Sequence, residues 1–160
     1  MRVLVQRVLR AEVRVGREVV GTVGHGLLLL VGIGHRDTEL ELSWMARKVA
    51  RLRIFRDDQG LMNRSVLDIG GGILSVSQFT LYGDCLKGNR PSFVESAPGD
   101  RAAPWIERFA ELLREAGVGH VASGRFGAMM EVESVNDGPV TLWIEREAPT
   151  GERNDAQPGP

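Results

Sequence analysis

The stretch GLLLLVGIGHRDTELEL, residues 26–42, decides the fold more than any other part of the chain. Residues 27–33 are apolar apart from Gly32, which predicts a strand that is buried on both faces. Thr38 and Glu41 then have the spacing of a capping box at the start of a helix. The apolar stripe of this helix comprises Leu42, Met45, Val49 and Leu52.

Strands and helices also alternate on both sides of this stretch. Upstream, valines alternate with polar residues and predict two or three short antiparallel strands, with turns at Gly16-Arg17 and at residues 24–26. Downstream, we expect a strand from 53 to a turn at 57–60, a strand over 73–81, a helix over about 100–116 with Pro104 in or near its first turn, and strands over about 128–135 and 140–145. This order predicts an α/β or α+β domain with the helices on one side of a mixed sheet.

Length and composition are those of one globular domain. The chain has 160 residues, of which 42% are hydrophobic and 26% charged, and its net charge is −1. Residues 1–146 contain no linker and no internal repeat, so we expect them to form a single domain. From residue 147 the chain is rich in Pro, Gly and charged residues, which predicts a flexible C-terminal tail over 147–160.

The single cysteine, Cys85, excludes a disulfide framework and a thiolate zinc site, and indicates a reducing compartment. The longest apolar run, residues 27–31, is too short to cross a bilayer. The N-terminus also lacks the uninterrupted apolar stretch of a signal peptide. We therefore expect a cytoplasmic protein that does not bind membranes.

Motifs of familiar catalytic and metal sites are absent. The chain contains no G-x-S-x-G elbow, no H-E-x-x-H, no C-x-x-C and no complete phosphate-binding loop. The three histidines, His25, His35 and His120, have no other ligand types at metal spacing, so surface positions are the simpler interpretation. We expect neither a metal ion nor a cofactor. A nucleophilic role for Cys85 stays open, although no histidine is near it in the sequence.

Three segments are richer in unusual residues than a core requires. Residues 77–81 (SQFTL) end an apolar strand, and their hydroxyls either bond within the sheet or face a small polar ligand. Residues 87–93 (KGNRPSF) are either a solvated loop or a site for a phosphate or a nucleic-acid end. Residues 136–141 (NDGPVT) are either a turn between two strands or a rigid Gly-Pro unit whose carbonyls shape a pocket. A Gly-Pro bond also admits the cis form at modest cost.

Together these segments resemble the D-aminoacyl-tRNA deacylase family. The similarity runs from about residue 1 to 145, in order and without evident gaps. One such motif alone is weak, whereas all of them in register are highly specific. The matching segments are residues 6–8, 52–55, 62–63, 77–81, 87–93, 124–128 and 136–141.

The resemblance implies a homodimeric hydrolase that cleaves the ester of D-aminoacyl-tRNA and releases free D-amino acid and tRNA, a proofreading step in translation. Glycine esterified to a non-cognate tRNA is an additional expected substrate, because glycine has no side chain to reject. The implied fold is the three-layer α/β/β type of this family, with mixed, largely antiparallel sheets and two main helices.

The resemblance also assigns roles to residues. One subunit supplies a wall made of Ser77, Gln78, Phe79 and Thr80. The partner supplies Gly138 and Pro139, joined by a cis bond, and this unit selects the chirality of the substrate. Phe126 and Met130 line the adenosine end, Arg7 steadies the Gly-Pro unit, and the loop cations Lys87 and Arg90 contact tRNA.

The expected mechanism relies on the backbone. No Ser-His-Asp set is evident, so we expect the N–H groups of Phe79 and Thr80 to form an oxyanion site. The resemblance implies that the ribose 2′-OH of the substrate takes part. Thr80 as a nucleophile is the competing hypothesis. Two other functions stay open: a non-catalytic dimeric module that binds RNA ends or adenosine, and an unrelated hydrolase that uses Cys85.

Overall fold

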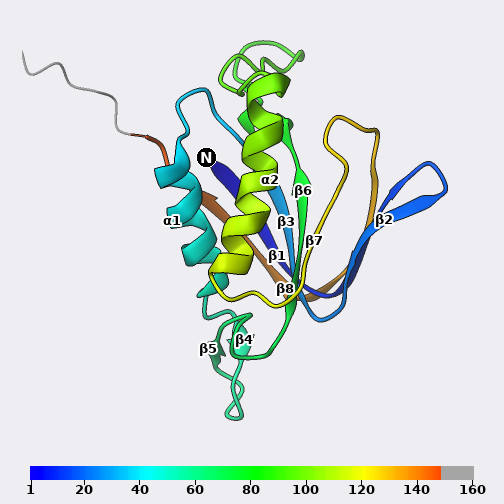
Figure 1. Cartoon of the computed structure of the whole chain (residues 1–160), viewed down its shortest axis with the longest axis vertical. Coiled ribbons are helices and arrows are strands. Elements are labelled where there is room, and N and C mark those ends of the chain that lie inside the picture. Colours follow the sequence, from blue (N-terminus) through cyan, green and yellow to red (C-terminus); the bar gives the residue numbers. More distant parts are fainter. Residues whose placement is uncertain (149–160) are drawn as a thin grey trace, which may run out of the picture.

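The computed structural model describes residues 1–148, in which two α-helices cover one side of a strongly curved sheet (Figure 1). The elements follow one another as β1 (Arg2–Val15), β2 (Glu18–Val23), β3 (Gly26–Gly32), α1 (Glu39–Ala50), β4 (Phe55–Arg56), β5 (Met62–Arg64), β6 (Gly72–Ser77), the 3₁₀ helix η1 (Phe79–Tyr82), α2 (Gly99–Glu115), β7 (Val121–Ser123) and β8 (Glu131–Glu145).

β1 is the centre of the sheet. It pairs antiparallel with β8 along almost its whole length, and on its other side with β3 and then β2. β6 is parallel to both β3 and β7. Because β2 also contacts β7, the sheet is nearly closed. The predicted mixed α/β fold with two main helices is confirmed. β4 and β5 form a separate hairpin that projects from one end of the molecule (Figure 1).

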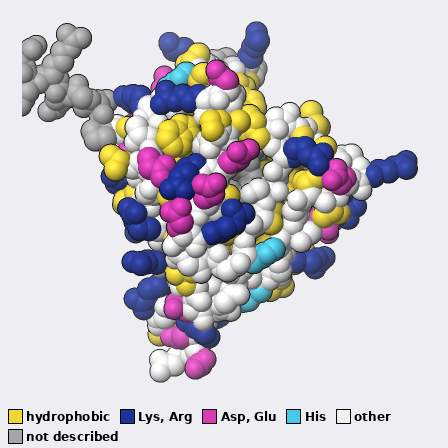
Figure 2. Space-filling view, in the orientation of Figure 1, with side chains coloured by type: hydrophobic (Ala, Val, Ile, Leu, Met, Phe, Trp, Pro, Cys, Tyr) yellow, Lys and Arg dark blue, Asp and Glu magenta, His cyan; other side chains and the backbone are white. Residues whose placement is uncertain are grey.

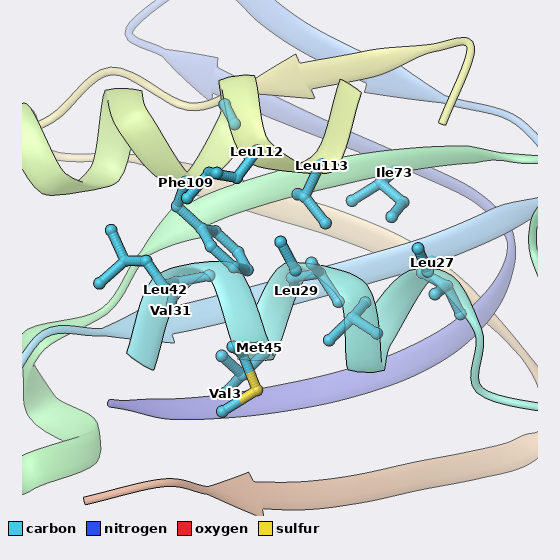
Figure 3. Packing of buried hydrophobic residues seen from close by; sticks show 14 of the residues in the cluster. Val3, Leu27, Leu29, Val31, Leu42, Met45, Ile73, Phe109, Leu112 and Leu113 are labelled. Carbon is cyan, nitrogen blue, oxygen red and sulfur yellow. The ribbon is translucent and has the colours of Figure 1, made fainter. Parts of the chain in front are cut away.

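The buried strand predicted from residues 27–33 is β3, and its two faces belong to two cores. Leu27, Leu29 and Val31 point toward α1 and α2, where they meet the side chains in Figure 3. Leu28 points the other way and packs with Leu74 in the smaller core inside the curved sheet. Burial on both faces is the physical reason for the continuous apolar sequence.

The capping box predicted at the start of α1 is confirmed. The Glu41 carboxylate accepts hydrogen bonds from the backbone N–H of Thr38 at 3.0 Å and from its hydroxyl at 2.6 Å. The Thr38 Oγ1 in turn accepts from the N–H of Leu40 at 3.3 Å. Burial alone would raise the pKa of Glu41, but the hydrogen bonds from Thr38 lower the pKa by more. The pKa of Glu41 therefore lies below its usual value.

We expect Thr38→Ala to lower the free energy of unfolding by about 1 kcal/mol at neutral pH. A carboxyl whose folded-state pKa is depressed stabilises the fold above its unfolded pKa, and this stability is lost as pH falls through the folded pKa. The substitution removes one cause of the depression, so its cost is largest at neutral pH and shrinks below about pH 4. Urea unfolding at pH 7 and pH 3.5 measures the loss in free energy of unfolding at each pH. An equal loss at the two pH values would contradict this account.

The structure corrects the sequence prediction at both long strands. The upstream valines form two antiparallel strands, as predicted, but the first of them, β1, is a long strand of 14 residues. The two expected C-terminal strands are instead one strand, β8, of 15 residues. Residues 136–139 are therefore no turn between strands. Gln6 pairs with Thr141 and Val8 with Asn136, so residues 137–140 bulge out opposite a single residue of β1, Arg7.

Two smaller boundaries also differ from the prediction. β6 ends at Ser77, and the expected strand residues up to 81 instead turn into η1. The strand expected from residue 53 is only the two-residue β4. Pro104 is the sixth residue of α2, near the first turn as predicted.

The C-terminal end of the predicted domain lies beside its first residue. Arg146 donates its backbone N–H to the carbonyl of Met1 at 2.9 Å. Of the predicted tail, residues 149–160 lie outside the described residues. Within the described part of the chain, no helix has both the length and the apolar character that crossing a membrane requires.

Candidate active site

A pocket of about 690 Å³ opens where β6 ends, between the first turns of α2 and residues 126–132. Its lining is mostly apolar, and the polar side chains among the lining residues are Ser77, Gln78 and Ser96. None of the lining residues is ionisable. The pocket therefore suits a largely uncharged ligand that is held by shape and by backbone groups.

The end of β6 forms one wall of this pocket, as expected for Ser77, Gln78 and Phe79. The N–H of Gln78 still donates to the carbonyl of Val31 at 2.7 Å, after which the chain turns into η1. Phe79 and Thr80 are the first residues of η1, where backbone N–H groups have no partner within the helix. In residues 1–148 neither N–H has an acceptor, so both are available to a ligand oxygen.

Thr80 differs from its neighbours, because it is exposed and does not line the pocket. Its hydroxyl accepts a hydrogen bond from the side-chain amide of Gln78. An amide cannot take up a proton as a base, so this contact does not activate the hydroxyl as a nucleophile.

The opposite wall contains the predicted residues Phe126 and Met130. Phe93 closes the rim against Phe79, with the two rings edge to face and their centroids 5.1 Å apart. Aromatic and thioether side chains of this kind suit the faces of a purine ring.

Sequence reasoning missed the floor of the pocket, which the first two turns of α2 provide through Gly99, Ala102 and Ile106. No site residue was predicted on this helix. The sequence signal for this floor is a pair of small residues, Gly99 and Ala102, at a spacing of three. They share one face of the helix and leave space above it.

The Gly138–Pro139 unit does not line the pocket of its own chain. It lies in the bulge of β8, with its peptide bond cis, and Gly138 has a φ of +119°. Arg7, which is buried, holds this unit. Its Nε lies 2.9 Å from the Asp137 carboxylate and donates to the Asp137 carbonyl at 3.2 Å, while its Nη1 donates to the carbonyl of Ile54.

The loop cations Lys87 and Arg90 are exposed and also lie outside the lining. They belong to a loop closed by paired backbone hydrogen bonds between Asp84 and Ser92, at 2.8 and 2.9 Å. Phe93, which follows directly, is part of the pocket rim, so the loop starts beside the pocket and extends away from it.

The remaining candidates have other surroundings. His35 and His120 contact the backbone carbonyls of Val94 and Thr22, and the Nε2 of His25 lies 4.0 Å from the Asp137 carboxylate. Across residues 1–148 there is no group of three or more His, Cys, Asp or Glu placed to hold a metal ion.

Comparisons with known proteins agree on one family. The family model D-Tyr-tRNA(Tyr) deacylase matches residues 4–145. A protein of Geobacillus sp. (strain WCH70) named D-aminoacyl-tRNA deacylase is 58% identical over 96% of this chain and all of its own length. One of Thermus aquaticus with the same name is 54% identical over 96% of this chain and all of its own.

Two solved structures share the fold. One, described as "c-Myc DNA Unwinding Element Binding Protein", is 43% identical with a TM-score of 0.87, over 92% of this chain and 100% of its own. The other, described as "Structural Analysis of a probable eukaryotic D-amino acid tRNA deacylase", has a TM-score of 0.75 at 21% identity, over 89% of this chain and 97% of its own.

Proposed function

The chain belongs to the D-Tyr-tRNA(Tyr) deacylase family, and from this premise we propose that two copies of it build each active site together. The activity follows from the relatives, which are named D-aminoacyl-tRNA deacylases at 54% to 60% identity. The protein is therefore a hydrolase that acts on D-aminoacyl-tRNA. The exposed, free Cys85 suits a reducing compartment, and we place the activity in the cytoplasm.

One observation carries the proposal of a two-chain site. The pocket has its apolar walls and the end of β6 in one chain, whereas the Gly138–Pro139 unit lies outside that pocket. The rim is also unusually apolar for a surface, because Phe79 is 56% exposed and Met129 is 89% exposed. A second copy whose Gly138–Pro139 unit covers this rim removes the exposed apolar surface and closes the pocket.

The proposed chemistry uses the two free backbone donors. The terminal adenosine binds between Phe126, Met130 and the floor of α2, and the ester carbonyl faces the N–H groups of Phe79 and Thr80. These groups stabilise the oxyanion as it forms, and such a donor contributes roughly 10²–10³ in rate. Ser77 and Gln78 position the ester. Water attacks the carbonyl carbon of the already activated ester, with the ribose 2′-OH assisting. The ester C–O bond breaks, the leaving 3′-oxygen of the tRNA takes up a proton from the water, and the free D-amino acid departs.

Chirality is read by the partner's Gly138–Pro139 unit. With its carbonyls facing the α-carbon, an L side chain collides with backbone that Arg7 and Asp137 hold in place. A D side chain points toward solvent instead. This arrangement predicts weak selection among D side chains and also admits glycine, which has no side chain to reject.

Matched D- and L-tyrosyl-tRNA test the proposed function. Incubation with the protein should release free tyrosine from the D ester and leave the L ester intact, and sedimentation at the assay concentration should show a dimer. Protection of the D ester would indicate a binding module. A fully active monomer would contradict the two-chain site.

We expect Thr80→Val to keep at least about a tenth of the wild-type single-turnover rate on D-tyrosyl-tRNA. The valine retains the backbone N–H that contributes to the oxyanion site, and the lost hydroxyl contacts only an amide. Complete inactivation of a folded dimer would instead assign the nucleophile to Thr80.

We expect Lys87→Ala and Arg90→Ala to weaken tRNA binding without slowing the chemical step. Each phosphate contact that is lost should reduce the slope of log K against log salt by about one unit. Titrations at several salt concentrations measure the slope, and single-turnover rates at saturating enzyme measure the step. A slower step with an unchanged slope would show that the loop acts in catalysis.

A further inference from the structure

The chain has a second basic region, which the net charge of −1 does not reveal because acidic residues elsewhere offset its positive charge. Between residues 42 and 56 the chain has five cations and no acidic residue, and one more arginine follows in β5. All six side chains are exposed. We call them the cationic face; they are Arg47, Lys48, Arg51, Arg53, Arg56 and Arg64.

Within the described part of the chain, nearby carboxylates balance these cations only weakly. Hydrogen bonds lower the pKa of Asp68 most, and the charges of Arg64 and Arg53 lower it further, but at a longer range than an ion pair. None of the six takes part in an ion pair in this part of the chain, whereas Arg108 alone pairs with three glutamates. Arg53, Arg56 and Arg64 donate hydrogen bonds to uncharged oxygens of neighbouring residues, and these bonds supply no counter-charge. Like charges held close together destabilise a fold slightly, and a bound polyanion reverses that cost.

The cationic face is continuous along one edge of the molecule. Arg47 and Arg51 are four residues apart, with Lys48 beside them, so they share one face of α1 and its C-terminal end. Figure 2 shows Lys and Arg side chains in a row down the edge that α1 forms in Figure 1. The row leads toward the β4–β5 hairpin.

The hairpin end of this face lies beside the Gly138–Pro139 unit. The carbonyl of Ile54, which lies between Arg53 and β4, accepts a hydrogen bond from Arg7. The same arginine forms the ion pair with Asp137. A cavity of about 330 Å³ beside it is lined by Arg56, Arg64 and Asp137, together with His25, Phe55 and Ile69.

We propose that the cationic face binds the phosphates of the base-paired part of the tRNA whose 3′ end occupies the partner's pocket. This inference rests on the proposed two-chain site, which puts the cationic face of one chain next to the pocket of the other. A nucleic-acid duplex carries one charge per roughly 1.7 Å of its axis, so a row of arginines suits it. RNA is favoured because the substrate is an RNA.

The test uses a full-length variant, Arg47→Gln with Lys48→Gln and Arg51→Gln, and a control with the same change in charge, Arg10→Gln with Arg14→Gln and Arg17→Gln. Each is assayed on D-tyrosyl-tRNA and on the D-tyrosyl ester of a single-stranded CCA trinucleotide, which lacks a duplex. Circular dichroism and sedimentation confirm that each variant is a folded dimer. A further variant, Arg56→Gln, tests the hairpin end with one substitution.

We expect the cationic-face variant to lose about 100-fold in kcat/KM on tRNA at 0.1 M salt, with a salt slope smaller by about three units. Its kcat/KM on the trinucleotide ester and the activity of the control should stay unchanged. Arg56→Gln should lose about fivefold on tRNA only. Equal losses on both substrates, or no loss on tRNA, would overturn the inference.

Competitors identify the polyanion. Uncharged tRNA should inhibit the wild type and fail to inhibit the cationic-face variant. If the variant instead loses only binding to duplex DNA or to vesicles of anionic lipid, the face serves that other partner and the inference is wrong. A wild-type protein that leaves D-tyrosyl-tRNA intact would contradict the proposed function itself, which is a separate outcome.

Discussion

Ala102→Phe should lower kcat/KM for D-tyrosyl-tRNA by about 1,000-fold or more, a loss of about 4 kcal/mol in transition-state stabilisation. Ala102 is 8% exposed and forms part of the pocket floor in α2. A phenyl ring at this position fills space that the terminal adenosine needs. Ala102 also belongs to the larger core, so the substitution should lower the stability of the fold as well as fill the pocket.

Ala103→Phe is the matched control, because Ala103 neighbours Ala102 in α2 but does not line the pocket. This variant should keep its activity within a few fold. Single-turnover assays and thermal unfolding of both variants separate a blocked pocket from a damaged helix. An active Ala102→Phe enzyme would show that the adenosine binds elsewhere.

Gly138→Ala should reduce the D-to-L rate ratio by about 100-fold, or about 2.7 kcal/mol of discrimination. Its φ of +119° is a conformation that side chains other than glycine's rarely adopt. A Cβ here would also lie 3.0 Å from the Arg7 guanidinium and 3.0 Å from the Val140 side chain. The unit must therefore shift, and the carbonyls that reject L side chains shift with it.

Gly16→Ala separates this effect from general backbone strain. Gly16 also has a positive φ, of +61°, but a Cβ there meets no atom within 4 Å, and the residue lies in the β1–β2 turn. Both variants should lose stability, and only Gly138→Ala should lose selectivity. Hydrolysis of D- and L-tyrosyl-tRNA by the two folded variants decides this, and equal ratios would mean that chirality is read elsewhere.

Local signals predicted the local structure well. The capping box and the continuous apolar run placed α1 and β3, because each depends on neighbouring residues. The sequence Asn136-Asp137-Gly138-Pro139 misled for the opposite reason. Its composition is typical of a turn, but its conformation is set by the pairing of β8 with β1, more than 120 residues away in sequence. Because Arg7 of another strand holds this bulge, the neighbouring residues in the sequence do not indicate it.

The candidate site was predictable to a similar extent. The resemblance named Ser77, Gln78, Phe79, Phe126 and Met130, and the structure brings these together around one pocket. The floor on α2 was missed because packing in the core already explains the apolar face of this helix. The cationic face was missed because acidic residues elsewhere reduce the net charge of the whole chain to −1.

The most direct measurement of the two-chain site combines Gly138→Ala chains with about a tenfold excess of Ala102→Phe chains by co-expression. Nearly every working pocket then belongs to a Gly138→Ala chain and faces the intact Gly138–Pro139 unit of an Ala102→Phe partner. The D-to-L rate ratio of this mixture should rise about tenfold above that of Gly138→Ala alone; about one in eleven Gly138→Ala chains still pairs with its own kind and limits the recovery. A ratio that stays at the value of Gly138→Ala would mean that each chain reads chirality with its own residues.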